Sequence, residues 1–302
     1  MRRQPPRRSR GGAIALTVVA SLAAVLVFAL VVVGGRGTLP MGAAQGSAAA
    51  AQATGGSAST TEGSAVNTEP ADSTDEGSSG MVAGPGAFRA MIDAGQVHSI
   101  RLIGDSITAG YLCDGWADPD VAKTTDVMYD NGHGQIHYEP SPSIDCWAND
   151  FRVWAQGHGV SRFVNAGLGG WTMGMLSDYP SFWIGDGADV IFVALGTNDA
   201  AYDGSEALRQ AAESALPVVA ENCKLMVVVG PTDNERYDVS IADTVRDANQ
   251  VLREVCADHN YIYVDCYDCV TTDDLNDDLL HPTSEGSHKI WQRICTELSL
   301  EG

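Results

Sequence analysis

The sequence predicts an α/β fold built on a parallel sheet of about five strands, and three observations support this class. From about residue 85 onward, short apolar runs rich in β-branched residues alternate with longer segments of helical periodicity. The run Lys224–Gly230 is almost continuously apolar, which is typical of a strand covered on both faces of a sheet. Alternating strands and helices also imply right-handed crossovers between parallel strands.

Five segments are predicted strands because they are rich in Val, Ile and aromatic residues and are bounded by turn-forming residues. In chain order they are Val97–Ile103, Arg162–Val164, Asp189–Leu195, Lys224–Gly230 and Tyr261–Asp265. Ligands of open α/β folds bind at the carboxyl ends of the strands. Polar residues that directly follow these strands are therefore the first candidates for a functional site.

Five segments are predicted helices from the spacing of their apolar residues. They are Ala87–Ile92, Trp147–Gly157, Ser205–Glu221, Ile241–His259 and Ser284–Leu298, with Ser205 expected as an N-cap. The segment Leu112–Asp145 is rich in Asp, Gly and Pro and is predicted to be a long loop that shapes the site. A turn region is expected at Pro180–Gly187.

The first quarter of the chain has the composition of a membrane anchor followed by a linker. Residues 1–11 carry five arginines, and residues 12–34 carry no charge. A membrane-spanning helix needs about 20 apolar residues, and a basic flank stays in the cytoplasm. We therefore predict a cytoplasmic N-terminus at 1–11 and a transmembrane signal anchor at 12–34, with a cleaved signal peptide as the alternative. The location predicted is the cell membrane, with an extracellular catalytic domain, or secretion after cleavage.

Residues 35–84 are mostly Gly, Ala, Ser and Thr and lack the large apolar side chains that offset the entropy of ordering. They are predicted to form a disordered linker, which leaves 85–302 as the globular domain. The net charge of the chain is −21. An acidic surface of this kind repels nucleic acid, so nucleic acid is not an expected partner.

Seven cysteines lie in the predicted extracellular domain, where disulfides are common. Cys113 and Cys146 bracket the long loop and could be linked, and Cys223 and Cys256 could also pair. Cys266 and Cys269 have the spacing of a redox or half-zinc motif, but no second pair of metal ligands accompanies them. We expect no metal or organic cofactor.

A candidate nucleophile follows the first predicted strand, in the stretch Ile103-Gly104-Asp105-Ser106. Serine is a weak nucleophile by itself and needs a base, a group that orients the base, and donors for an oxyanion. Asp278 and His281 lie three residues apart before the last predicted helix. That spacing lets the carboxylate reach one imidazole nitrogen while the other faces the serine.

Two further strand ends carry candidate oxyanion donors. The stretch from Asn165 to Thr172 contains three glycines, which let a backbone N–H approach a ligand closely. Asn198 follows the strand Asp189–Leu195 and offers a side-chain amide. Asp105 and Asp199, which neighbour these donors, are interpreted as structural carboxylates that hold their loops.

These four stretches, in this order, resemble the blocks that define the SGNH (GDSL-type) serine hydrolase family of esterase-like and lipase-like acylhydrolases. The resemblance implies a flavodoxin-like three-layer α/β/α sandwich. It also implies that Ser106 is the nucleophile, His281 the general base and Asp278 its partner. The oxyanion hole it implies consists of the N–H groups of Ser106 and Gly170 and the amide of Asn198. The second block differs from the common form of the family at 169–172.

The activity expected from these residues is that of an exported, membrane-tethered serine esterase that acts on esters, with short acyl groups favoured, through an acyl-enzyme. The expected substrate is a small ester or one attached to a glycan. Two alternatives remain open from the sequence: an acyltransferase of the same family acting on extracellular glycans, and a catalytically silent carbohydrate-binding module.

Overall fold

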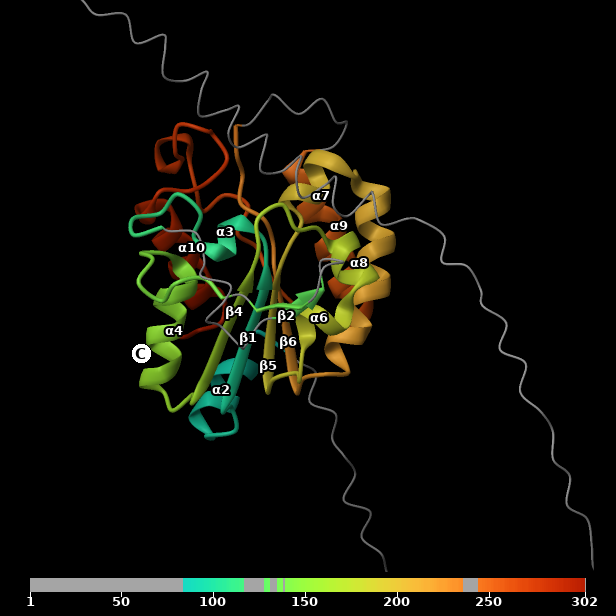
Figure 1. Ribbon diagram of the computed structural model, residues 1–302. Helices are drawn as coiled ribbons and strands as arrows, with labels where there is room; N and C mark the ends of the chain where they lie inside the picture. The colour runs from blue at the N-terminus through green and yellow to red at the C-terminus, as the bar shows by residue number, and fades with distance from the viewer. Residues whose placement is uncertain (1–83, 117–127, 131–134, 138, 236–243, 302) are drawn as a thin grey trace, which may run out of the picture. The chain divides into compact units, whose positions relative to one another are not determined.

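A computed structural model describes residues 84–116, 128–130, 135–137, 139–235 and 244–301 of the chain (Figure 1). The predicted N-terminus, anchor and most of the linker, at 1–83, lie outside the described residues. Within the described ranges, no helix has both the length and the apolar character needed to cross a membrane.

The centre of the fold is a sheet of five parallel strands in the order β4-β1-β5-β6-β7. The strands are β1 (Ser99–Gly104), β4 (Arg162–Gly167), β5 (Val190–Ala194), β6 (Leu225–Val229) and β7 (Ile262–Val264). Each one coincides with a predicted strand, and the predicted parallel sheet is confirmed. Gly104 pairs with Gly167 and Ala194, so the carboxyl ends of the three neighbouring strands lie level with one another.

Helices cover both faces of this sheet, which makes three layers (Figure 1). One face is covered by α2 (Ala87–Asp93), α4 (Trp147–Gly157) and α10 (Ser284–Glu297). The other is covered by α5 (Met173–Asp178), α6 (Pro180–Ile184), α8 (Ser205–Ala220) and α9 (Val245–His259). Alternate strand residues enter the two hydrophobic clusters: Ile191 and Val193 face α8 and α9, whereas Val190 and Phe192 face α2 and α4. The predicted three-layer class is therefore confirmed.

Several short elements were not predicted. Pro180–Gly187, expected to be a turn region, contains α6, and further short helices occur at α3 (Ser106–Ala109), α7 (Thr197–Tyr202) and η1 (Thr272–Asp274). The expected long loop contains an antiparallel pair, β2 (Met128–Asp130) and β3 (Gln135–His137). Helices of one turn are too short to show an apolar period, which explains why the sequence pattern missed them.

Two further expectations need correction. Gly204, not Ser205, is the N-cap of α8, and no side chain caps this helix. The cysteines of the structure are free thiols, so neither suggested disulfide is formed. The Cys113 sulfur instead contacts the carbonyl oxygen of Pro282 at 3.7 Å, and that of Cys223 contacts the carbonyl of Val219 at 3.4 Å.

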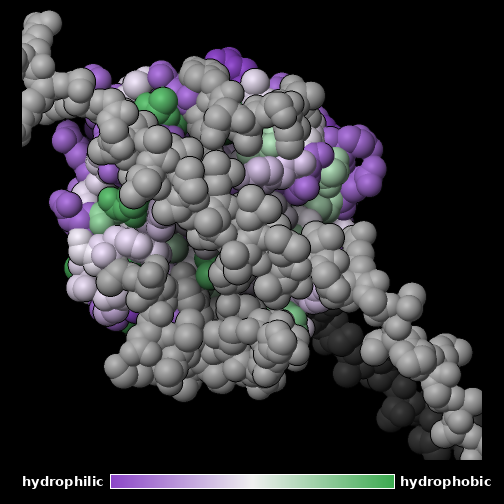
Figure 2. Space-filling view, turned by 45° about the horizontal axis from the view of Figure 1, so that its top comes forward, coloured by the Kyte–Doolittle hydropathy of each residue, from purple (hydrophilic) through white to green (hydrophobic). Residues whose placement is uncertain are grey.

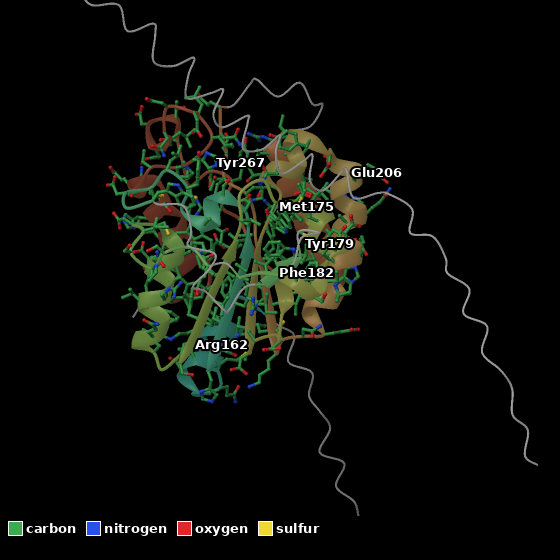
Figure 3. All side chains as sticks on the ribbon, in the orientation of Figure 1. Arg162, Met175, Tyr179, Phe182, Glu206 and Tyr267 are labelled. Carbon is green, nitrogen blue, oxygen red and sulfur yellow. The ribbon has the colours of Figure 1, made fainter. Side chains whose placement is uncertain are left out.

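Side chains on the α5–α6 side of the molecule form an aromatic surface separate from the sheet edge. Figure 3 shows Met175, Tyr179 and Phe182 together on this side, and the rings of Tyr179 and Phe182 stack with their centroids 5.8 Å apart. Tyr179 is about half exposed, at 47%. It is therefore an accessible aromatic residue at the junction of α5 and α6, and among the described residues its ring stacks on Phe182 and not on Tyr111 or Trp116.

Candidate active site

Ser106 lies at the carboxyl end of β1, as the first residue of α3. Asp105 caps this short helix by accepting a hydrogen bond from the backbone N–H of Ile107 at 2.9 Å. Gly104 is required at the turn because a Cβ there would lie 2.1 Å from Oγ1 of Thr108. The half-buried Ser106 therefore begins a tight strand-to-helix turn, and its own N–H is one of the helix N-terminal donors that lack an intrahelical partner.

The loop before α10 places His281 against Ser106, although the two residues are 175 positions apart. Nε2 of His281 lies 2.7 Å from Oγ of Ser106, and Nδ1 lies 2.5 Å from Oδ2 of Asp278. Oδ1 of Asp278 accepts the backbone N–H groups of Leu280 and His281 at 3.2 and 3.1 Å. One carboxylate thus holds both the imidazole and the turn that carries it.

The environment of Asp278 favours its ionised form. Partial burial opposes ionisation, but the hydrogen bond and the charge of His281, with the two backbone N–H groups, outweigh it and lower the pKa of Asp278. An ionised carboxylate accepts a hydrogen bond from the N–H at Nδ1 of His281. The proton is then held at Nδ1, which leaves Nε2 free to accept the proton of Ser106.

The glycine-rich stretch after β4 lies beside Ser106. A Cβ added at Gly169 would lie 3.9 Å from Cβ of Ser106, whereas Gly170 has a φ of +78° and open space where its Cβ would be. The left-handed backbone at Gly170 favours glycine and changes the direction of the chain there. Gly169 is therefore near the serine, and the proposed donor Gly170 follows it directly in the chain.

Asn198 lies in the first turn of α7, directly after β5, and its amide bonds to the glycine-rich stretch. Its Nδ2 donates to the carbonyl oxygen of Trp171 at 2.9 Å. Asp199 supports the same stretch, since its carboxylate accepts the N–H of Met173 at 2.9 and 3.1 Å. The structure thus connects the second and third sequence blocks directly.

Asp105 and Asp199 are buried carboxyl groups beside the proposed catalytic residues. Burial is the main cause that raises the pKa of Asp105 to about 6, against hydrogen bonds from Ile107 and Thr108 and the charge of His281. Burial likewise raises the pKa of Asp199 to about 7. Both carboxylates accept backbone N–H groups, and Asp105 also accepts the side chain of Thr197; such contacts are expected of the structural roles that the sequence suggests.

Sequence reasoning missed Tyr111, which packs against the imidazole of His281. The two ring centroids are 4.7 Å apart with an interplanar angle of 64°. Tyr111 in turn contacts Trp116, with centroids 5.1 Å apart at 74°. The signal available in the sequence was weak: an aromatic residue five positions after the serine, following the glycine at which α3 ends.

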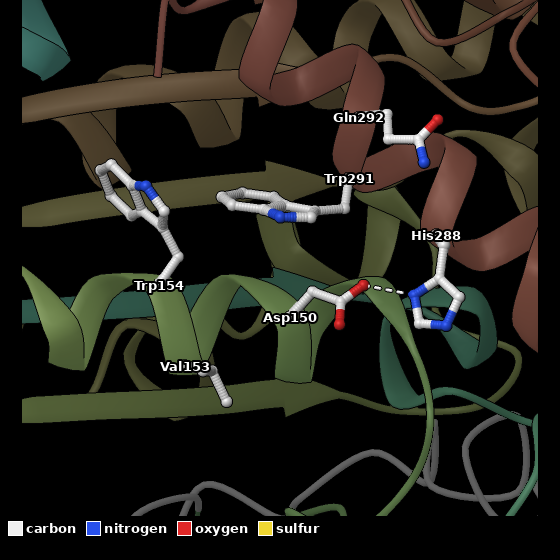
Figure 4. Close-up of a pocket in the computed structure, with 6 residues that line it drawn as sticks. All are labelled: Asp150, Val153, Trp154, His288, Trp291 and Gln292. Carbon is white, nitrogen blue, oxygen red and sulfur yellow. Dashed lines mark hydrogen bonds and ion pairs between the residues drawn. The ribbon is translucent and has the colours of Figure 1, made fainter. Parts of the chain in front are cut away.

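A surface cavity lies elsewhere, between α4 and α10 (Figure 4). Its volume is about 380 Å³, and its lining residues are Asp150, Val153, Trp154, His288, Trp291 and Gln292. Nδ1 of His288 lies 2.5 Å from Oδ2 of Asp150 within it. None of the proposed catalytic residues line this cavity. In the described ranges, no cluster of three or more His, Cys, Asp or Glu residues could hold a metal ion.

The chain is similar to one known protein family and to several solved structures. Residues 102–289 match the GDSL-like Lipase/Acylhydrolase family. A search of curated proteins finds no match. Among solved structures, LAE5, an alpha/beta hydrolase enzyme from the metagenome of Lake Arreo, Spain, is similar with a TM-score of 0.51 and 18% identity over 68% of this chain and 97% of LAE5. Axe2, an acetylxylan esterase from Geobacillus stearothermophilus, is similar with a TM-score of 0.50 and 17% identity over 68% of this chain and 95% of Axe2. At this identity, the structural matches show a common fold.

Proposed function

Since the chain belongs to the GDSL-like lipase/acylhydrolase family, it is a carboxylic ester hydrolase, and we propose that Ser106, His281 and Asp278 perform the hydrolysis. The observation that carries the proposal is the pair of contacts made by one imidazole. Its Nε2 lies 2.7 Å from the serine hydroxyl and its Nδ1 lies 2.5 Å from the aspartate. These are the contacts needed for a nucleophile, its base and the group that orients the base.

In the proposed reaction, Nε2 of His281 takes the hydroxyl proton as Oγ of Ser106 attacks the ester carbonyl carbon. The negative charge that forms on the carbonyl oxygen is stabilised by the N–H groups of Ser106 and Gly170 and by the Asn198 amide. The intermediate then expels the alcohol, which receives the proton from His281, and leaves an acyl group on Ser106. Water activated by the same imidazole releases the acid and restores the serine.

The nucleophile is tested by Ser106→Ala in the full-length chain kept in detergent, with 4-nitrophenyl acetate as the substrate. We expect kcat to fall at least about 10³-fold, because the covalent step is lost. Ser161→Ala is the matched control, since Ser161 lies exposed before β4 and donates only to the carbonyl of His98. A fluorophosphonate that labels the wild type but not Ser106→Ala gives an independent readout. Unchanged hydrolysis or labelling in Ser106→Ala would exclude this nucleophile.

We further propose that the natural substrate carries a short acyl group on an extracellular glycan. The predicted location outside the cell supports a glycan rather than bulk lipid, and Axe2, which has the same fold, is an acetylxylan esterase. Ethyl esters with acyl chains from acetate to decanoate test the acyl preference. We expect kcat/KM to be highest for acetate or propionate, and a maximum at decanoate would contradict the proposal.

The location is also a proposal, and it depends on residues 12–34. The uncharged length of this segment and the five arginines before it support a single-pass anchor with the domain outside the cell. Alkaline carbonate extraction and external protease applied to intact cells test this arrangement. We expect the chain to stay with the membrane and its domain to be accessible from outside. Release of a shortened chain into the medium would instead establish signal cleavage.

A further inference from the structure

The aromatic pair formed by Tyr111 and Trp116 borders the proposed catalytic histidine. Tyr111 packs on the imidazole at 4.7 Å, and Trp116 packs on Tyr111 at 5.1 Å, each at a steep angle. Both side chains are only partly buried. Each residue therefore keeps part of its surface exposed, and the ring of Tyr111 lies directly against the imidazole of His281.

Hydrogen bonds at both ends hold the loop that carries this aromatic pair. The N–H of Tyr111 donates to the carbonyl of Ser106 at 2.9 Å, and the N–H of Trp116 donates to that of Cys113 at 3.0 Å. Between them, the N–H of Asp114 donates to Oγ of Ser284 at 2.9 Å. The aromatic pair is thus connected to both the nucleophile and the segment that follows His281, and its position does not depend on a bound substrate.

The chemistry of the reaction determines which half of an ester lies near these rings. When the tetrahedral intermediate breaks down, Nε2 of His281 delivers its proton to the departing alcohol oxygen. That oxygen must therefore lie on the imidazole side of Ser106, whereas the carbonyl oxygen faces the donors at Gly170 and Asn198. Because Tyr111 packs on the imidazole, the alcohol half of the ester is the half that reaches the aromatic pair.

The surroundings of the aromatic pair favour an alcohol that is neutral and amphipathic. Aromatic rings with a polar end suit a ligand that has an apolar face and hydrated edges, as a sugar ring has. Asp114 lies within the same loop, between Tyr111 and Trp116, and is exposed. Its carboxylate disfavours phosphorylated or otherwise anionic alcohols.

We propose that Tyr111 and Trp116 bind the sugar ring of the alcohol, so that the preferred substrate is an O-acylated neutral sugar. This inference rests on the proposed catalytic function of Ser106 and His281. It assigns specificity for the alcohol to the loop after the nucleophile helix, and it assigns no role in acyl-chain selection to these two rings.

The test compares two acetate esters, an O-acetylated methyl xyloside and ethyl acetate, with the full-length chain in detergent. The acyl group is constant, so the ratio of the two kcat/KM values reports on the alcohol alone. In Trp116→Ala, we expect this ratio to fall about 3- to 10-fold, the range corresponding to one aromatic contact. Trp116→Phe is expected to recover part of the loss. Tyr179→Ala, on the α5–α6 surface, is the matched aromatic control and should leave the ratio unchanged (Figure 3).

A third ester, ethyl butyrate, separates the two halves of the substrate. The ratio of ethyl butyrate to ethyl acetate should be the same in Trp116→Ala as in the wild type. A change in this acyl ratio, or an equal fall on all three esters, would overturn the assignment of Trp116 to the alcohol. A wild-type chain that hydrolyses none of the esters would instead contradict the proposed function itself. Thermal unfolding measured by circular dichroism verifies that each variant is folded.

Discussion

At the scale of single residues, Asn198 is the proposed oxyanion donor whose contribution can be measured most directly. A primary amide has two N–H donors, and the contact with the Trp171 carbonyl uses one of them. The remaining donor is the one proposed for the substrate. We expect Asn198→Ala to lower kcat about 10²- to 10³-fold with a smaller effect on KM, because the stabilised charge exists only in the transition state.

The matched control for this prediction is Asn222→Ala, since Asn222 is exposed and its side-chain amide donates to the carbonyl of Val218 within its own segment. Steady-state kinetics with ethyl acetate would compare the two variants. Asn198→Ala that retains wild-type kcat would show that the oxyanion is stabilised without this side chain.

The buried carboxyl group of Asp105 leads to a second prediction, which concerns how the free energy of unfolding depends on pH. Its pKa is raised from 3.8 to about 6, so the folded state holds this proton more tightly than the unfolded state. The contribution to stability is complete below pH 3.8 and is lost as the pH rises toward 6. The shift corresponds to about 3 kcal/mol.

Asp105→Asn removes this titration while it keeps an oxygen that can cap α3. The free energy of unfolding of Asp105→Asn, minus that of the wild type, should therefore increase between pH 4 and pH 7, by up to about 3 kcal/mol. Urea denaturation at the two pH values measures this difference. A difference that is independent of pH would show that Asp105 has an ordinary pKa in the folded protein.

The identity of the candidate residues follows from the sequence, but their packing does not. Ser106, Asp278 and His281 belong to sequence blocks with recognisable spacing, and the structure brings all three into contact. The contact of Tyr111 with the imidazole arises only when the end of α3 meets the loop before α10. No local sequence pattern in either segment predicts this contact.

At the scale of elements, the joint between α4 and α10 depends on His288. Its Nδ1 lies 2.5 Å from Oδ2 of Asp150 in α4 (Figure 4), and its Nε2 lies 3.3 Å from Oδ1 of Asp145, just before α4. Burial acts to lower the pKa of His288, but the hydrogen bonds and charges of the two carboxylates outweigh it and raise the pKa. The raised pKa gives stability that is fully present below about pH 6.5 and is lost as the pH rises through the folded-state pKa.

We expect His288→Gln to destabilise the protein at pH 5.5 and to have a smaller effect at pH 9. Urea denaturation at both pH values measures this difference. His98→Gln is the control, because His98 is exposed just before β1. A destabilisation of equal size at both pH values would assign the role of His288 to packing rather than to its charge.

The strands and the long helices were predictable because each spans at least one full period of its apolar pattern. The almost continuously apolar β6 and the regularly spaced apolar residues of α9 are examples. By contrast, α5, α6 and α7 have five or six residues each; α5 directly follows the glycine-rich segment, and α7 contains Asn198. Their helical form depends on contacts such as that of Asp199 with the N–H of Met173, which the sequence does not reveal.

At the scale of the whole molecule, the parallel sheet explains how separate sequence blocks form one site. The segments after β1, β4 and β5 meet at the same sheet edge because these three strands are neighbours in the order β4-β1-β5 (Figure 1). The alternation of strands and helices predicted the parallel sheet but not this order, which depends on the path of each crossover. The family resemblance supplied the expectation that the blocks converge.

The net charge of −21 predicts which charged esters the molecule attracts and which it repels. Hydrophilic side chains predominate around the described margin of the face in Figure 2, and Asp114, eight residues after Ser106, and Asp277, next to Asp278, are both exposed. A negative potential of this kind concentrates cations and repels anions, and salt screens it over about 10 Å at 0.1 M.

Acetate esters of a cationic, a neutral and an anionic alcohol therefore differ in their expected salt dependence. Between 20 and 500 mM NaCl, kcat/KM should fall for acetylcholine, stay constant for ethyl acetate and rise for 3-acetoxypropane sulfonate, by roughly 2- to 10-fold for the charged esters. Because ethyl acetate shares the acyl group, it corrects for any effect of salt on the catalytic step. Parallel salt dependence for all three esters would show that the acidic surface does not reach the substrate, and selection against anionic alcohols would then have to arise from contacts within the site.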